Sequence, residues 1–354
     1  MKNILNYFKK NEKYIGPIFM FGGFFIDSLT LRRSDLLAEN LLLLFYLLLA
    51  GIIIMVINKY QQSRYVSIFN FLLFFTFGGL FSVFTVFYVR SSAISASWPF
   101  LILLFGAMIS TEFLRKQYQI FNIQISVYFL AIFSFLIFHL PIVTGIMNFW
   151  IFMISGLVAL TIIYFYLFII KKFINKNILF LKNIVTISML FLIVNFMYFL
   201  NFIPPVPLVM MDAEIGINVV KENNIYKITD YKNDSVKLLG LINWKEKISL
   251  LPNQRIYFFN SVFAPSKIKT EIYHVWQKYD TKTNKWQNVA KIPINLQGGR
   301  DYGYRSYSYV SNYSSGKWRV VIETGKGQVV GIHNFNVEVI NNIYLLEDVI
   351  FKYK

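Results

Sequence analysis

The pattern of apolar and polar residues divides the chain into two unlike parts. Up to about residue 203, long apolar runs are separated by short polar segments. Beyond about residue 248, apolar and polar residues alternate with a period of two. About 20 apolar residues cross a bilayer as a helix, whereas a period of two marks a half-buried strand. The pattern therefore predicts a helical membrane domain followed by an all-β domain.

Seven segments of the first part are long and apolar enough to cross a bilayer. They lie at about residues 14–31, 36–57, 66–89, 92–113, 121–143, 146–170 and 183–203. Lys9, Lys10 and Lys13 precede the first segment, as they would precede the apolar core of a signal peptide. Charged residues follow it instead of a small-x-small cleavage site, so we predict a retained first span and a bundle of about seven spans.

Basic residues predict the orientation of these spans, because Lys and Arg collect in cytoplasmic loops. With the N-terminus in the cytoplasm, the inner segments hold 12 Lys and Arg residues and the outer segments hold 3, namely Arg32, Arg33 and Arg90. Trp98 and Trp150 agree, since both lie near the outer ends of their spans, where Trp is enriched. An odd number of spans then places the C-terminal domain outside the cytoplasm.

The second part predicts an antiparallel β-sandwich. Six or seven short strands recur with turns about every 8–12 residues, which is typical of that architecture. The clearest strands are expected at 255–262, 271–279, 286–294, 302–310, 318–322 and 329–339. We predict a transmembrane domain at 1–203, a Pro-rich exit and linker at 204–244 with a possible strand at 225–229, the sandwich at 245–342 and a C-terminal tail at 343–354.

Composition narrows the chemistry. The chain contains no Cys, which excludes disulfides, thiolate metal sites and a Cys nucleophile. Its net charge is +17, and both parts are basic. In the first part the excess follows from topology. In the second, it suits anionic glycans or lipid headgroups, although lysines scattered over a solvated sheet are the commoner explanation. We expect no nucleic-acid partner outside the cytoplasm, and no sequence feature indicates an oligomeric state.

A cluster of charged residues stands at the junction of the first two spans. It consists of Asp27, Arg32, Arg33, Asp35 and Glu39. The last two acids are one helical turn apart and project from one face. Charge within a membrane segment is costly and points to function, but long side chains at the interface reach water. The cluster is therefore either a salt-bridged end of a helical hairpin or a site for a lipid headgroup or divalent cation.

In the β domain, His274 and Trp276 share a strand face with Ile272. They are either core residues or the polar contact and platform of a pocket, since histidine titrates near neutral pH. His333 is the only other histidine in this part, and two histidines without an acidic pattern make a poor metal site. No catalytic motif is present, so we expect no catalytic residue, metal or cofactor.

The 300–309 stretch alternates aromatic, basic and small residues. Arg300, Tyr302, Tyr304 and Arg305 carry the groups that recognition surfaces favour, because exposed aromatic rings beside Arg bind glycans and proteins. Alternatively, aromatic pairs across strands hold the sheet together. We treat these four residues, with His274 and Trp276, as candidate binding residues.

Three segments of the second part resemble a known family. They are HVW at 274–276, GGRDYGYRSYS at 298–308 and GKWRVVIETGKGQVVGIHNF at 316–335. Together they are similar to the bacterial domain-of-unknown-function family number 2914, over roughly residues 245–340. DSLTLRRSDLLAENL at 27–41 and the exit IPPVPL look like the membrane portion found with some members. The resemblance implies a β domain on a multi-pass anchor in the bacterial inner membrane, and implies no activity.

These observations favour a binding or interaction module, anchored in the membrane, that recognises a cell-wall glycan, an envelope protein or a lipid headgroup. Two alternatives stay open. One is a membrane enzyme or transfer protein that uses Asp27, Asp35 and Glu39 on a lipid-linked substrate at the outer interface. The other is an accessory component of a transporter or channel.

Overall fold

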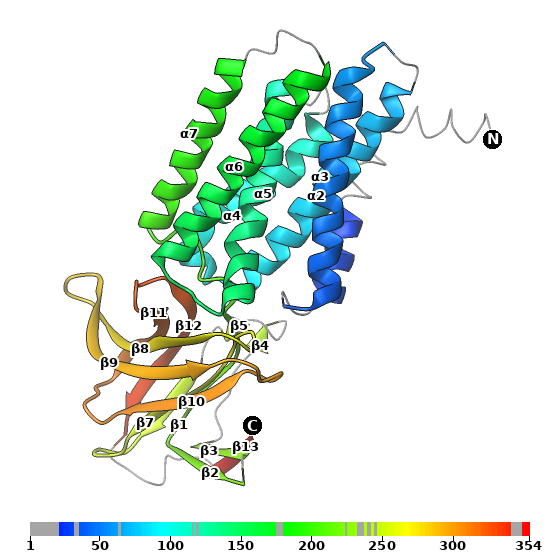
Figure 1. The fold of residues 1–354 in the computed structure, drawn as a ribbon. Coiled ribbons are helices and arrows are strands. Elements are labelled where there is room, and N and C mark those ends of the chain that lie inside the picture. The colour runs from blue at the N-terminus through cyan, green and yellow to red at the C-terminus, as the bar shows by residue number, and fades with distance from the viewer. Residues whose placement is uncertain are drawn as a thin grey trace. The chain divides into compact units, whose positions relative to one another are not determined.

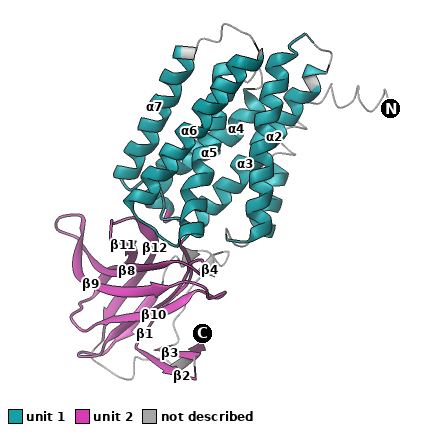
Figure 2. Ribbon diagram, viewed as in Figure 1, with its two compact units in different colours: residues 1–90, 94–207 teal, residues 91–93, 208–354 magenta. Residues whose placement is uncertain are grey.

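A computed structural model of the protein describes residues 21–31, 35–62, 65–114, 117, 120–174, 180–223, 225–231, 237–238, 242–243, 246–340 and 349–354. The chain divides into two compact units, one of residues 1–90 and 94–207 and one of residues 91–93 and 208–354 (Figure 2). The first unit is helical and the second is built from β-sheets (Figure 1).

Six helices of the first unit are long and apolar enough to cross a membrane, counted over the described residues. They are α2 (Leu37–Lys59), α3 (Val66–Arg90), α4 (Ile94–Phe113), α5 (Phe121–Thr144), α6 (Phe149–Ile174) and α7 (Phe180–Phe199). These helices coincide with the last six predicted spans. Residues 21–30 are also helical, whereas the beginning of the predicted span 14–31 lies outside the described residues.

The helices satisfy polar groups within the bundle, as a bilayer requires. The buried Asn58 side chain of α2 donates to Oε1 of Gln124 in α5 at 2.7 Å. The Tyr88 hydroxyl of α3 donates to the carbonyl oxygen of Ser134 in α5 at 2.9 Å. Interhelical hydrogen bonds of this kind help to hold membrane helices together, because within lipid the hydrophobic effect does not drive helices to associate.

A glycine allows α6 to approach two neighbouring helices. A Cβ atom added at Gly156 would lie 2.7 Å from Cε2 of Phe191 in α7 and 3.0 Å from Cζ of Phe133 in α5. The two rings are stacked, with centroids 5.9 Å apart. The absent side chain thus makes room for aromatic packing, the usual role of small residues between membrane helices.

The described residues of the second unit form two larger sheets and two smaller ones. In a three-stranded sheet, β7 (Ile256–Phe263) lies between β1 (Val209–Gly216) and β10 (Tyr304–Val310). A five-stranded sheet has the order β6 (Lys247–Leu250), β12 (Val329–Val339), β11 (Gly316–Thr324), β8 (Lys269–Asp280) and β9 (Lys285–Gln297). The smaller sheets are β13 (Val349–Tyr353) with β3 (Ile225–Tyr231) and β2 (Asn218–Glu222), and β4 (Lys237–Leu238) with β5 (Ile242–Asn243).

The two larger sheets share an aromatic core. Phe258 of β7 packs edge-on against Trp276 of β8, with ring centroids 6.3 Å apart. Trp276 in turn meets Phe335 of β12 edge-on at 6.2 Å. Edge-to-face contacts at such distances are favourable beyond the area that they bury. Ile272, His274 and Trp276 are all fully buried, as the period of two in β8 predicted.

Strands also form in the ranges predicted as linker and tail. β1 pairs with β7, and β13 pairs with β3. Their sequences carry buried or half-buried charges that obscure the alternation: Nζ of Lys352 lies 2.6 Å from Oε2 of the buried Glu214, and Nζ of Lys354 lies 2.7 Å from Oδ2 of Asp212. Ion pairs therefore stand where a hydrophobic pattern would have revealed the strands.

The buried His274 gives the β unit a testable dependence on pH. Burial lowers the pKa of His274 from 6.5 to about 4. Below pH 6.5 the unfolded chain therefore binds a proton that the folded chain excludes, so stability present above pH 6.5 is lost as the pH falls towards 4. From pH 7 to pH 5 we expect a loss of about 2 kcal/mol in the full-length protein. Hydrogen exchange of β8 and β11 peptides, corrected for intrinsic rates, measures it.

His274→Gln is the matched variant, because it removes this titration and leaves every other ionisable group in place. The difference between the two proteins therefore isolates His274, even if the variant is less stable at every pH. Parallel loss of protection in both proteins between pH 7 and pH 5 would contradict the assignment.

Candidate functional site

The structure places two of the predicted binding residues in the core. Nδ1 of His274 lies 2.9 Å from Oγ of Ser308 in β10, and Nε1 of Trp276 donates to the same oxygen at 3.0 Å. Ser308 thereby connects the two larger sheets. Since both rings are fully buried, their position matches the core interpretation, and neither lines the pocket described next.

The other candidates lie on or beside a loop of residues 298–303, whose path depends on glycines. A Cβ at Gly298 would lie 1.9 Å from the carbonyl oxygen of Pro265. Gly303 has φ +77°, and a Cβ there would lie 2.5 Å from Oγ of Ser261 and 2.9 Å from the carbonyl carbon of Val262. Only glycine combines positive φ with such close backbone approach. The loop is therefore held against β7 and the segment that follows it.

Hydrogen bonds complete the loop. The Gly303 amide donates to the carbonyl oxygen of Arg300 at 2.9 Å, which closes a turn. The Gly299 amide donates to the carbonyl oxygen of Ala264 at 3.0 Å. The hydroxyl of Ser261 in β7 donates to the carbonyl oxygen of Tyr302. These contacts fix the backbone from which Arg300 and Tyr302 project.

A second element meets this loop across the outer side of the three-stranded sheet. β2 and β3 form an antiparallel pair in which Lys221 lies opposite Tyr226. Val219, Tyr226 and Ile228 of this pair pack with Phe259 of β7. Because residues two apart in a strand share a face, Lys221 lies on the same face as Val219, at the end of the strand. The apolar contact thus brings Lys221 towards β10.

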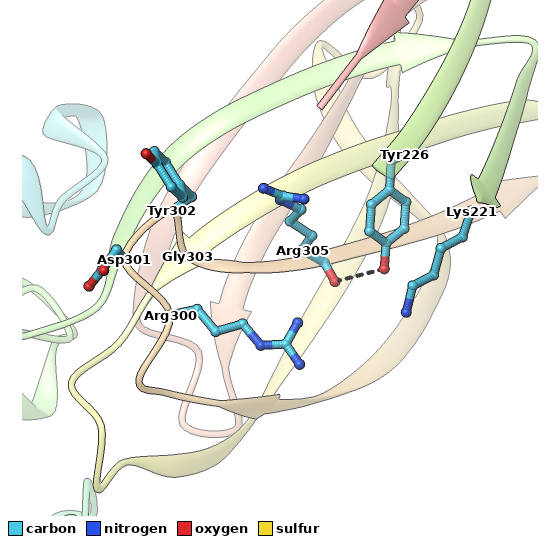
Figure 3. Close-up of a pocket in the computed structure, with 7 residues that line it drawn as sticks. All are labelled: Lys221, Tyr226, Arg300, Asp301, Tyr302, Gly303 and Arg305. Carbon is cyan, nitrogen blue, oxygen red and sulfur yellow. Dashed lines mark hydrogen bonds between the residues drawn. The ribbon is translucent and has the colours of Figure 1, made fainter. Parts of the chain in front are cut away.

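A pocket of about 310 Å³ lies between these two elements (Figure 3). Its lining residues are Lys221, Tyr226, Arg300, Asp301, Tyr302, Gly303 and Arg305. Three predicted binding residues, Arg300, Tyr302 and Arg305, are therefore brought together. Lys221 and Tyr226 were missed by sequence reasoning, because they lie about 80 positions away in a stretch without a clear strand pattern. Their only signal was the possible strand at 225–229.

The polar groups of the pocket have defined neighbours. The Tyr226 hydroxyl donates to the carbonyl oxygen of Arg305 at 3.4 Å, and the Arg305 guanidinium donates to the carbonyl oxygen of Lys354 at 3.3 Å. The Arg300 guanidinium lies 4.9 Å from the centre of the Tyr304 ring. The Tyr304 ring therefore packs against the Arg300 guanidinium. Tyr302, in contrast, is 76% exposed.

Electrostatics favour an anion in this pocket. Three of its lining residues are basic and one is acidic. Burial is the main cause that raises the pKa of Tyr226 above its usual 10, and nearby tyrosines add to the shift while Arg300 and Arg305 oppose it. The hydroxyl is accordingly protonated at neutral pH, and it donates its hydrogen bond to the carbonyl oxygen of Arg305. Clefts lined by one sign of charge concentrate ligands of the opposite sign.

One member of the predicted charged cluster, Asp27, has a hydrogen-bond partner in the helical unit. Oγ of Ser82 in α3 donates to Oδ2 of Asp27 at 2.5 Å. The Arg90 guanidinium, at the end of α3, donates to the carbonyl oxygens of Leu31 and Ser28, where the helix of residues 21–30 ends. A cation satisfies the free carbonyls of a helix C-terminus. Arg90 was not part of the predicted cluster.

The remaining members of the cluster are only partly described. Arg32 and Arg33 lie outside the described residues. Glu39 lies close enough to Arg90 for an electrostatic attraction, and Asp35 stands just before α2. Within the portion of the chain that the structure covers, no group of three His, Cys, Asp or Glu residues could hold a metal ion.

Comparison with solved structures gives only remote likenesses. The β-glucosidase from Listeria innocua in complex with gluconolactone is 11% identical over 37% of this chain and 16% of that chain, with a TM-score of 0.22. A mutant of that enzyme in complex with laminaribiose is 12% identical over the same shares, also with a TM-score of 0.22. This chain spans only about 16% of the length of those enzymes.

The Pseudomonas fluorescens alkylpurine DNA glycosylase AlkC, bound to DNA containing an abasic site analog, is 10% identical over 76% of this chain and 81% of that chain. Its TM-score is 0.18. Neither this likeness nor the likeness to the β-glucosidases supports an argument about the fold or function of the chain, because the TM-scores are too low. No curated protein matches the chain.

One family matches a defined segment of the β unit. Its description is "Protein of unknown function (DUF2914)", and the match covers residues 269–337. The segment runs from the beginning of β8 into β12 and includes the loop of Arg300 and Tyr302. Residues 269–337 thus match the same family that the sequence motifs resemble.

Proposed function

We propose that the protein is a membrane-anchored module that binds a ligand outside the cytoplasm, and that the pocket of Lys221, Tyr226 and Arg300 is its binding site. The pocket carries the proposal: within the β unit it gathers basic and aromatic side chains from the loop before β10 and from the β2–β3 pair. Such convergence of a few polar groups in a concave site is typical of ligand binding.

The proposed architecture is a bundle of seven spans followed by an antiparallel β-sandwich. Six apolar helices and the helical residues 21–30 support the span count. The aromatic core between the two larger sheets supports the sandwich. The bias of 12 to 3 in basic residues supports a cytoplasmic N-terminus and an extracytoplasmic β unit in the bacterial inner membrane.

The proposed partners are components of the envelope, either a cell-wall glycan, an envelope protein or a membrane lipid. The charged cluster gives little support to an enzyme at the outer interface. Asp27 accepts a hydrogen bond from Ser82, and the nearby Arg90 donates to helix carbonyl oxygens. These contacts favour the interpretation of a closed helix end.

The absence of Cys from the sequence allows a clean test of topology. In Lys282→Cys the thiol stands in the loop between β8 and β9, and in Gln61→Cys it stands between α2 and α3. We expect a membrane-impermeant maleimide to label the first variant in intact spheroplasts and the second only after permeabilisation. Labelling with the opposite dependence would reverse the proposed orientation and remove the envelope partners.

A second experiment tests the pocket. A photo-crosslinking amino acid at position 302, in the full-length protein in its native membrane, should yield a discrete adduct because the Tyr302 side chain is mostly exposed at the pocket. Adding Arg300→Ala should abolish that adduct. Adding Arg255→Gln should leave it intact, because Arg255 is exposed directly before β7 and does not line the pocket. The measurement is the adduct yield on denaturing gels.

The same crosslinker at position 282 is the positional control, since this loop lies outside the pocket lining. An identical adduct from both positions, or an adduct at 302 that survives Arg300→Ala, would count against the pocket as the binding site.

A further inference from the structure

We propose that the pocket binds a phosphate monoester, with Lys221 and Arg300 as the groups that contact its phosphoryl oxygens. This inference rests on the proposed function, because it names the ligand class of the same pocket. It follows from the placement of the cations, from their lack of acidic partners among the described residues, from the charge of the pocket and from its size.

The first observation is convergence. Figure 3 shows the Arg300 guanidinium and the Lys221 ammonium group approaching the Tyr226 hydroxyl from different sides. The ammonium nitrogen of Lys221 lies 5.7 Å from the centre of the Tyr226 ring. An anion placed between them could therefore meet a planar guanidinium and a point charge, a combination that suits a tetrahedral group with several acceptor oxygens.

The second observation is that the two cations are not used for ion pairs. Among the residues that the structure describes, Lys221 and Arg300 contact only the rings of Tyr226 and Tyr304. Elsewhere in the β unit, several basic side chains are paired with acids, as Lys352 is with Glu214 and Lys291 is with Glu323. Both pocket cations are exposed, so a ligand can reach them without breaking an ion pair to any described residue.

The third observation is charge. Three basic residues and one acidic residue line the pocket, which gives its side chains a net charge of +2. Figure 3 shows the Asp301 carboxylate directed away from the Arg300 guanidinium. A phosphate monoester carries about −1.5 to −2 at pH 7, whereas a carboxylate or a phosphodiester carries about −1. The monoester balances the pocket more completely than either alternative.

The fourth observation is size and the remaining surface. A volume of about 310 Å³ is at the small end of ligand pockets, which span roughly 300–1,000 Å³. It suits a phosphoryl group joined to a small polyol better than a nucleotide. The exposed ring of Tyr302 gives the organic part of the ester an apolar face, which inorganic phosphate would leave unused.

The same chemistry has two sources, a soluble phosphate ester and a lipid whose headgroup is a phosphate monoester. The test therefore uses the full-length protein in phosphatidylcholine nanodiscs, with glycerol 3-phosphate as the probe in titration calorimetry. We expect saturable binding of glycerol 3-phosphate and none of glycerol. Affinity should rise between pH 5 and pH 7, as the second phosphate proton, with pKa about 6, is lost.

Substitutions then assign the site. Arg300→Gln and Lys221→Gln should each weaken binding by about tenfold or more, since each removes a charge-assisted hydrogen bond. Arg255→Gln is the matched control and should bind as the parent does, because Arg255 contacts Tyr309 and does not line the pocket. All three side chains are exposed, so the variants should keep the parent's thermal unfolding midpoint, which is measured alongside.

A second set of nanodiscs, doped with phosphatidic acid, separates the sources. Competition that lowers the apparent affinity for glycerol 3-phosphate identifies a lipid headgroup as the occupant, and unchanged affinity identifies a soluble ester; both results support the monoester class. No binding of glycerol 3-phosphate, equal binding of glucuronate, or equal weakening by Arg255→Gln overturns it. If that happens while the crosslink at 302 still depends on Arg300, only the ligand class is wrong; if the crosslink fails too, the proposed function falls with it.

Discussion

The register of β10 against β7 determines both the core of the β unit and the pocket on its surface. In this register Ser306 lies opposite Asn260 and donates to its Oδ1 at 2.5 Å, and Ser308 reaches His274 and Trp276 in the interior. A slip of one residue would exchange the faces of the strand, which would bury tyrosines and expose these serines. The register also fixes where the loop of residues 298–303 joins β10. The position of Arg300 in that loop therefore follows from the pairing of β10 with β7.

Basic side chains of the β unit have two kinds of described contact, either an ion pair with an acid or a contact with an aromatic ring. The small sheet is fastened to β1 by ion pairs such as Lys352 with the buried Glu214, where loss of one partner would leave a costly unpaired charge. Lys221 stands on the same small sheet, yet its described contact is an aromatic ring. Side chains that already have an acidic partner stabilise the fold, whereas Lys221 and Arg300, which form no ion pair with a described residue, are the groups that we propose a ligand contacts.

Much of the architecture could be predicted from the sequence, because the signals are local. Six spans follow from apolar runs of about 20 residues, and β8 follows from its alternation through Ile272 and Trp276. β1, β2 and β13 were not predicted, since charged residues such as Glu214 and Lys352 find partners only in three dimensions. For the same reason, Arg300 and Tyr302 were recognised as candidates while Lys221 and Tyr226 were not. Apolar packing of the β2–β3 pair on Phe259 brings the two groups of residues together, and no spacing along the chain predicts this packing.

The two halves of the pocket differ in how far the family match extends. The matched segment, residues 269–337, supplies Arg300, Tyr302 and Arg305, whereas Lys221 and Tyr226 lie before it. The glycines that fix the loop belong to the matched segment, whereas the β7 and Ala264–Ser266 groups that they approach lie before it. Lys221 and Tyr226 come from the β2–β3 pair. If the pocket is the binding site that we propose, its choice of ligand depends in part on a short hairpin outside the matched segment.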